Sequence, residues 1–263
     1  MKRTIKEVDP VRGICQITTQ DERFYARRIK ISEDDAGVWD FVPSVTWVCS
    51  FYPKGVNFYR WLAGKGWDEA EEIKANAGDR GSKVHQAIGV LLSGGVVEMD
   101  DSFENPRTLE QEPLTASEYE CLMSFVGWFQ ETRPEVLDFE YTVWNEKYRY
   151  AGTIDLKCRI KGKVWIIDIK TSPEIWPAFE LQVSAYRQAE PVSAEERKNI
   201  KLAILQVGYR RNKKGWRFVP VRNQFALFLA ARRIWKKETD GQKPLQREYP
   251  LKLSLVQQEE NVQ

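Results

Sequence analysis

Two apolar segments separated by a short turn signal constrain the fold more than any other part of the sequence. The second segment, residues 164–170, is rich in β-branched and aromatic residues. The Lys161-Gly162-Lys163 stretch before it favours a tight turn. The pattern predicts two antiparallel β-strands over residues 150–171.

The two strands of this hairpin carry acidic residues at matching positions. Side chains in a strand point alternately to its two faces, so Asp168 and Lys170 share one face. A two-residue turn at Lys161-Gly162 would pair residues whose numbers have a constant sum, which places Asp155 opposite Asp168. Directly opposed Cβ atoms lie about 4.5 to 5.5 Å apart.

Opposed carboxylates at this distance need a cation between them. They repel each other, and partial burial raises the pKa of one of them unless a positive charge compensates. Mg²⁺ is typically held by one or two carboxylates, with water and substrate phosphate completing its shell. Asp155 and Asp168 therefore predict a metal site suited to phosphodiester hydrolysis. The alternative is that both acids face solvent and Lys170 is only an ion-pair partner, but it does not explain an acid in the centre of an apolar strand.

Three motifs along this part of the chain carry a resemblance to a known family. They are Gly152-Thr153-Ile154-Asp155, then Ile166-Ile167-Asp168-Ile169-Lys170-Thr171, and then Gln182 followed four residues later by Tyr186. Together they resemble the PD-(D/E)XK nuclease superfamily, and within it the RecB-like exonuclease group, which includes many phage enzymes. The resemblance extends from about Ser44 to about Tyr209.

The resemblance implies both a fold and residue roles. The expected fold is α/β, with a restriction-endonuclease-like core in which helices flank a central mixed β-sheet. A metal ion, Mg²⁺ or Mn²⁺, would be held by the two aspartates, with a backbone carbonyl as a further ligand. The lysine would orient or activate the attacking water, and two side chains on the next helix would clamp the substrate. In this sequence these residues are Asp155, Asp168, the carbonyl of Ile169, Lys170, Gln182 and Tyr186.

Two further residues are implied as metal ligands. Residues 80–85, Arg-Gly-Ser-Lys-Val-His, resemble a string of the group in which the histidine approaches the metal. His85 is the one histidine in the chain, although a structural histidine at the edge of an apolar helix stripe is the alternative. Glu140, on a strand expected over residues 136–144, occupies a position where the group often has an acid, and a solvent-facing acid is equally expected there. These two residues would complete a second metal position, so two ions are expected.

Helix signals surround these motifs. Ser44 is expected to cap a helix that continues through Phe58, Tyr59 and Trp61, whose rings are predicted to lie in the core. Ser82 is expected to cap the helix that carries His85. A further helix is expected over residues 176–189, where proline fixes its start.

Basic residues suggest where a substrate would bind. Residues 210–217 form a basic turn, and such clusters attract a phosphate backbone, whereas an exposed tryptophan can stack on a base. Solvated surface charge is an equally expected alternative. The substrate-binding candidates are Arg80, Arg210, Arg211, Lys213, Lys214 and Trp216.

Composition limits the other classes of function. The formal net charge is only +2, so any surface for nucleic acid must be local. The sequence shows neither a signal peptide nor a membrane span, and an intracellular, cytoplasmic and soluble protein is expected.

The cysteines give no sign of a metal cluster. They lack C-x-x-C spacing. Some RecB-like relatives hold an iron–sulfur cluster with cysteines near the C-terminus. No cysteine follows Cys158, so no cluster is expected.

The sequence predicts three parts and one leading function. Residues 1–42 would form a β preamble with a hairpin of strands 14–18 and 24–29, residues 43–245 the nuclease domain, and residues 246–263 a tail. The expected activity is that of a metal-dependent DNA exonuclease in recombination, repair or replication. Alternatives are an endonuclease or structure-specific nuclease on the same core, or an inactive nuclease-like module that binds DNA. Opposed carboxylates argue against the last, because a binding scaffold gains nothing from them.

Overall fold

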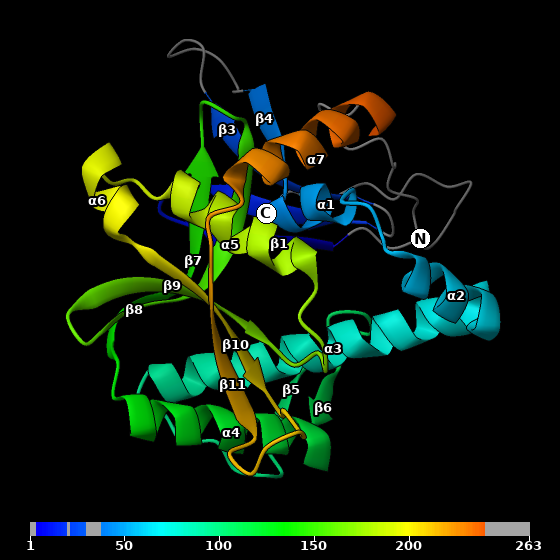
Figure 1. The fold of residues 1–263 in the computed structure, drawn as a ribbon, viewed down its shortest axis with the longest axis vertical. Coiled ribbons are helices and arrows are strands. Elements are labelled where there is room, and N and C mark those ends of the chain that lie inside the picture. The colour runs from blue at the N-terminus through cyan, green and yellow to red at the C-terminus, as the bar shows by residue number, and fades with distance from the viewer. Residues whose placement is uncertain (1–3, 20–21, 30–37, 240–263) are drawn as a thin grey trace, which may run out of the picture.

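A mixed five-stranded sheet forms the centre of the molecule (Figure 1). The computed structural model describes residues 4–19, 22–29 and 38–239. Along the sheet the strand order is β11-β10-β9-β8-β7, and only the β9–β10 pair is parallel. The strands are β7 (Glu135–Asn145), β8 (Tyr150–Ile160), β9 (Lys163–Lys170), β10 (Lys201–Val207) and β11 (Trp216–Val221). The α/β class and the mixed sheet are confirmed.

The β8–β9 hairpin has the predicted register. Its ladder runs from the Ile160–Lys163 pair to the Leu156–Ile167 pair, so Asp155 and Asp168 are the next positions along the two strands. Lys161 and Gly162 form the turn with φ values of 48° and 75°. Positive φ at both central residues is the geometry of a type I′ turn, whose twist matches that of the flanking strands.

Helices cover both faces of this sheet and enclose two apolar cores. On one face, α5 packs with α1 and α7 over a core that includes Ile166. On the other face, α3 and α4 lie over a core that includes Ile167 and Ile169. Full burial of each such side chain stabilises the fold by about 1.5–3 kcal/mol. The helices are α1 (Val45–Ser50), α2 (Val56–Lys65), α3 (Trp67–Leu92), α4 (Ala116–Thr132), α5 (Pro177–Ala189), α6 (Ala194–Asn199) and α7 (Phe225–Thr239).

The predicted helix starts are only partly correct. Ser44 caps α1 as predicted, because its side chain accepts a hydrogen bond from the backbone of Trp47. The prediction for Ser82 is wrong: it lies inside α3, where its hydroxyl donates to the carbonyl of Gly78. The helix continues through this Gly-containing segment because its later residues pack into the core beneath it.

Helix α2 also departs from the prediction. The aromatic rings expected in the core lie on a helix that has no buried residue, and Tyr59 is 56% exposed. Helix α2 and the N-terminal part of α3 extend together from the body of the molecule (Figure 1). Helix α3 is long but contains many charged residues. No helix in the described ranges is both long and apolar enough to cross a bilayer.

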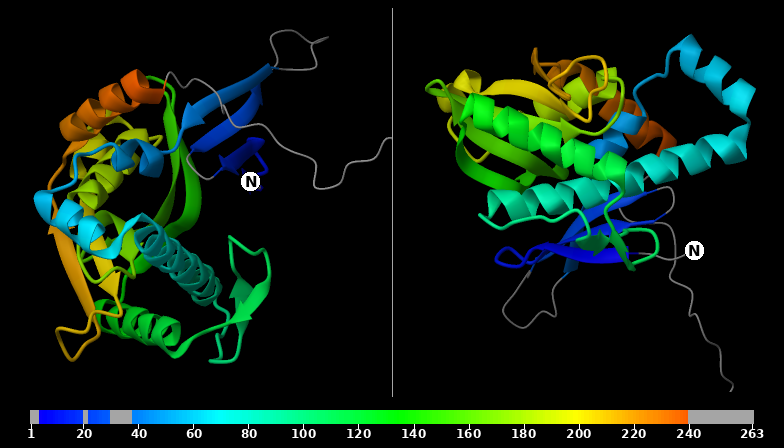
Figure 2. Two further views of the ribbon diagram at one scale, coloured as in Figure 1. Left: turned by 90° about the vertical axis from the view of Figure 1, so that its right-hand side faces the viewer. Right: turned by 90° about the horizontal axis from the view of Figure 1, so that it is seen from below.

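The N-terminal segment forms a larger sheet than the predicted hairpin. Four antiparallel strands pair in chain order, and Figure 2 shows them in blue beside the green strands of the central sheet. Tyr25 and Val42 pack there against Trp144 and Ala151 of the central sheet. The strands are β1 (Thr4–Asp9), β2 (Ile14–Thr18), β3 (Arg23–Ile29) and β4 (Val38–Pro43). The predicted tail, residues 246–263, lies outside the described residues.

A short hairpin connects α3 to α4. Its two strands, β5 (Ser102–Glu104) and β6 (Gln111–Pro113), pair antiparallel in the stretch between the two helices. Sequence patterns indicate only a loop there, because strands of three residues are too short to show an alternating pattern. The hairpin packs against α3, the helix that carries His85.

The β8–β9 turn gives a direct test of the hairpin. Gly162→Ala should lower the free energy of unfolding by about 1 kcal/mol, because a Cβ atom disfavours positive φ. A Cβ atom at Gly162 would meet no atom within 4 Å, so the loss would come from backbone conformation alone. Gly64→Ala, in open space within α2, is the control and should be neutral or stabilising. Equal changes for both variants in denaturant unfolding would contradict this turn geometry.

Candidate metal centre

The ladder between β7 and β8 has a bulge between Val136 and Asp138 and a second interruption, at which two acids lie. Phe139 pairs with Leu156 and Tyr141 pairs with Ile154, but Glu140 and Asp155 between them are not paired. Side chains before and after this point lie on opposite faces of the sheet. Phe139 and Leu156 belong to the core under α3 and α4, whereas Tyr141 and Ile154 belong to the core under α5. The interruption therefore releases both acids from the regular alternation of side chains.

Glu140 has a backbone conformation that non-glycine residues seldom adopt. Its φ is 46°, and such outliers persist where the surrounding structure holds them in place. From this position Glu140 Oε1 lies 3.2 Å from Nδ1 of His85 on α3, and Asp155 Oδ1 lies 3.7 Å from the same nitrogen. One ligand atom from each of His85, Glu140 and Asp155 lies within 4.8 Å of the others. The structure thus brings together three of the predicted metal ligands.

The backbone of Ile169 links two of these ligands. Its N–H donates to Asp155 Oδ2 at 2.7 Å, and its carbonyl accepts a hydrogen bond from His85 Nε2 at 3.0 Å. Since Nε2 carries the proton in this contact, Nδ1 is the ring nitrogen that faces the carboxylates. The Ile169 carbonyl, predicted as a metal ligand, is engaged by His85 here.

Asp168 lies beside the three-residue cluster and is fully buried. Lys170 Nζ lies 2.7 Å from Asp168 Oδ2 and forms an ion pair with it. Neither oxygen of Asp168 accepts a well-aligned hydrogen bond from any residue that the structure describes. Buried carboxylate oxygens normally have such partners, so this carboxylate has unused capacity for a ligand.

Electrostatics show how strongly the cluster needs positive charge. Burial raises the pKa of Asp168 to about 7 although Lys170 opposes the shift, and Asp155 adds to the rise. Burial also raises the pKa of Asp155, although His85 and Lys170 oppose it. Burial would lower the pKa of His85, but Asp155 and Glu140 outweigh it and raise this pKa to about 9. Without a metal ion, a protonated His85 and Lys170 balance the acids.

Gln182 and Tyr186 lie on α5 behind the carboxylates. Gln182 Nε2 donates to the Tyr186 hydroxyl at 2.7 Å, and both side chains are buried. Asp168 and Asp155 are close enough to raise the pKa of Tyr186, after the larger effect of burial. A Cβ atom at Gly152 would lie 2.5 Å from the Tyr186 ring, which explains the glycine in the Gly-Thr-Ile-Asp motif. Both side chains are buried, so the pair offers little surface to a substrate.

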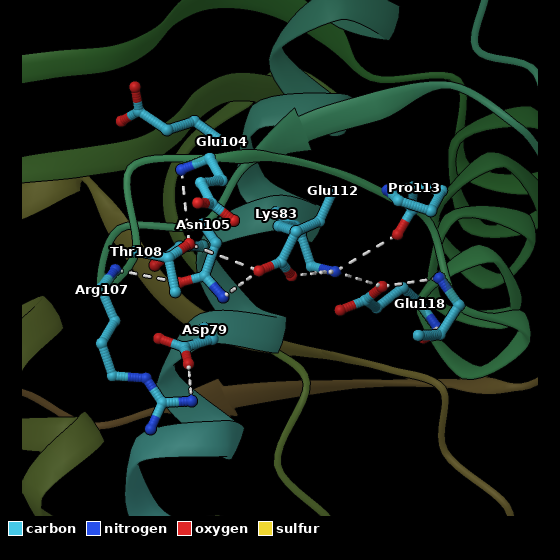
Figure 3. A network of polar contacts seen from close by, with 12 residues as sticks. Asp79, Lys83, Glu104, Asn105, Arg107, Thr108, Glu112, Pro113 and Glu118 are labelled. Carbon is cyan, nitrogen blue, oxygen red and sulfur yellow. Dashed lines mark hydrogen bonds and ion pairs between the residues drawn. The ribbon is translucent and has the colours of Figure 1, made fainter.

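A buried lysine fixes the helix that carries His85. Lys83 is 4% exposed, and its Nζ lies 3.1 Å from an oxygen of Glu118 and 3.5 Å from one of Glu112 (Figure 3). Glu118 also completes the capping box of α4, and Glu112 belongs to β6. Removing one partner of a buried ion pair costs about 3–5 kcal/mol. Lys83 is two residues before His85, and its network holds α3 against α4 and the β5–β6 hairpin.

Three of the basic candidates converge on one pocket. Arg80, Arg210 and Arg211 line a cavity of about 210 Å³ together with Thr171, which directly follows Lys170. A guanidinium nitrogen of Arg80 donates to the Thr171 carbonyl. The other two arginines form exposed ion pairs, Arg210 with Glu120 on α4 and Arg211 with Glu174.

The remaining basic candidates do not form an open cationic surface. Lys214 pairs with Glu131 on α4, and its Nζ lies 4.9 Å from the centre of the Trp216 ring. Trp216 packs partly against the core under α4, and Lys213 is exposed. Acids from α4 therefore neutralise much of the basic turn.

No model of a protein family matches this chain, and no curated protein matches it. The site itself therefore carries the functional argument.

Proposed function

We propose that this chain is a metal-dependent DNA exonuclease. The observation that carries the proposal is the Asp168 carboxylate, which is fully buried and has no well-aligned hydrogen-bond donor among the described residues. It lies next to Asp155 in the hairpin register, and Lys170 contacts it. Lys170 alone offsets its charge within one ion pair, and a fold built for stability alone would have given a fully buried carboxylate beside a second acid more donors than this.

The donor set fits a hard divalent cation. Asp155 and Asp168 would hold one Mg²⁺ or Mn²⁺, and His85 with Glu140 would contribute to a second position beside it. Carboxylates favour Mg²⁺ and Mn²⁺, and imidazole nitrogen suits later transition metals, so the histidine makes Mn²⁺ the better match of the two. When bound, such ions supply a nucleophilic water at neutral pH and stabilise charge on the phosphate.

The other residues of the chain would prepare the reacting groups. The ammonium group of Lys170 is close enough to the carboxylates to orient the attacking water by donating a hydrogen bond to it, and only the neutral amine form could take the proton of that water. Gln182 and Tyr186 would hold this arrangement from behind, because their burial keeps them in one position.

A nearby surface is suited to a phosphate backbone. Arg80 and Arg211 line the pocket beside Thr171, so their guanidinium groups could contact a phosphate next to the one that is cleaved. With a net charge of only +2, the protein would depend on such local contacts. The exonuclease mode and the DNA substrate come from the resemblance to the RecB-like group.

Substitution of Asp168 tests whether the site is catalytic. Asp168→Asn should abolish cleavage of DNA in Mg²⁺ or Mn²⁺ buffer while DNA binding persists, because the ion loses its anchor. The substitution removes the repulsion from Asp155 but also the ion pair with Lys170, so the melting temperature of the metal-free variant is measured alongside to show that it is folded. The exposed acid Asp138 on β7 provides a control, and Asp138→Asn should cleave normally. Normal cleavage by Asp168→Asn would contradict the assignment. Binding without cleavage in the wild type would favour an inactive DNA-binding module.

The shape of the DNA tests the exonuclease mode. Linear duplex should be degraded progressively to short products, whereas a covalently closed circle of the same sequence should survive, because the site would require a chain end. Gel analysis of both substrates over one time course measures the difference. Nicking or linearisation of the circle at the rate seen with linear DNA would instead show an endonuclease on the same metal site.

A further inference from the structure

The N-terminal sheet is fastened to the central sheet next to the metal centre. Beyond the unpaired acids Glu140 and Asp155, the ladder resumes with Tyr141–Ile154 and then Thr142–Thr153. Both threonines of this second pair form hydrogen bonds with the N-terminal sheet and its first turn. These contacts join segments that are more than 100 residues apart in the chain.

The contact to β8 depends on a buried tyrosine. The Tyr25 hydroxyl lies 3.0 Å from Thr153 Oγ1 and accepts a hydrogen bond of 2.8 Å from Gln16 Nε2. Tyr25 is only 2% exposed, so a hydroxyl without these partners would be left unsatisfied in the interior. Gln16 and Tyr25 are opposite each other on β2 and β3, which fixes the hydroxyl from the N-terminal side.

The contacts to β7 hold the other threonine of the pair. A guanidinium nitrogen of Arg12 donates to the Thr142 carbonyl, and Thr142 Oγ1 donates to the Val8 carbonyl at 3.4 Å. Arg12 is itself held by Asp9 through an ion pair of 2.6 Å. The N-terminal sheet and its first turn thus form hydrogen bonds with both β7 and β8 at the Thr142–Thr153 pair.

These hydrogen bonds lie close to the proposed metal ligands in the sequence. Thr153 is two residues before Asp155, and Thr142 is two residues after Glu140, so any shift of the pair moves the interrupted part of the ladder. On the other side of the interruption, His85 and its helix are held by the Lys83 network. Glu140 keeps its φ of 46° between these two supports.

From this arrangement we propose that Tyr25 is a positioning residue for the metal centre, acting through Thr153 on Asp155 and Glu140. The inference rests on the proposed function, since it presumes that these acids bind a divalent ion. It assigns the N-terminal sheet a part in the site, because the sheet sets the distance between carboxylates that a metal ion requires. Partners behind a metal ligand commonly orient it and tune its affinity.

Binding of Mn²⁺ tests the proposal without relying on cleavage. Tyr25→Phe keeps the ring and removes only the hydroxyl. It should raise the Mn²⁺ concentration at which the protein is half-saturated by about three- to tenfold. Electron paramagnetic resonance of free Mn²⁺ measures this concentration. The increase is less than the ~10–100-fold for a direct partner of a ligand. The Mg²⁺ concentration for half-maximal nuclease activity should rise by the same factor.

Tyr150→Phe is the matched control. Tyr150 is another fully buried tyrosine, and its hydroxyl donates to the Ala185 carbonyl in the core under α5. Both variants lose one buried hydroxyl, so their melting temperatures should fall to a similar extent, but Tyr150→Phe should bind Mn²⁺ as the wild type does. Equal Mn²⁺ binding by Tyr25→Phe and the wild type would overturn the proposal.

A second variant tests the same hydrogen bond from the side of Thr153, in case Tyr25→Phe folds poorly. Thr153→Val keeps the shape of the side chain and a high preference for strands, and it should weaken Mn²⁺ binding as Tyr25→Phe does. The double variant should bind no more weakly than either single variant, because both remove the same contact. Fully additive losses would refute transmission through this hydrogen bond. Absence of Mn²⁺ binding by the wild type would overturn the proposed function as well, which separates the two failures.

Discussion

Repulsion between two carboxylates on neighbouring strands sets the requirements for the surrounding structure. Asp155 and Asp168 are both buried, and the hairpin register makes them opposed positions directly after the last pair of the β8–β9 ladder. Without compensation, such a pair would oppose folding. The compensation comes from Lys170 on the same strand as Asp168 and from His85 on α3, which is distant in the chain. The sheet, the long helix and the N-terminal strands can all be understood by how they hold these charges together.

Local physical rules explain why the hairpin was predictable. A strand alternates with a period of two, and Lys161-Gly162 can adopt the positive φ values of a tight turn, so the register followed from residue numbers alone. The cap of α1 at Ser44 was predictable for a similar reason, since a serine side chain can bond a backbone N–H three residues later. The family-like role of His85 also led to a residue that contacts both Glu140 and Asp155.

Contacts between distant segments explain what the sequence did not reveal. Ser82 follows glycines that usually end or begin helices, but packing of α3 against the sheet continues the helix through them. No local pattern shows that Tyr25 reaches Thr153, or that acids of α4 pair with the basic turn through Arg210 and Lys214. No local pattern marks Lys83 as buried either, because a lysine beside an apolar stripe usually extends its charge to solvent.

The position of a bound ion tests the central claim most directly. Crystals of the wild-type protein grown with Mn²⁺ can be measured at a wavelength where manganese scatters anomalously, which identifies the metal independently of the protein atoms. The account predicts an anomalous peak within ligand distance of Asp155 and Asp168, at about 2.0–2.2 Å for oxygen ligands of an ion the size of Mg²⁺ or slightly larger. A second peak would lie near His85 and Glu140. Anomalous density only at surface acids elsewhere, with the Asp168 carboxylate still free of metal, would contradict it.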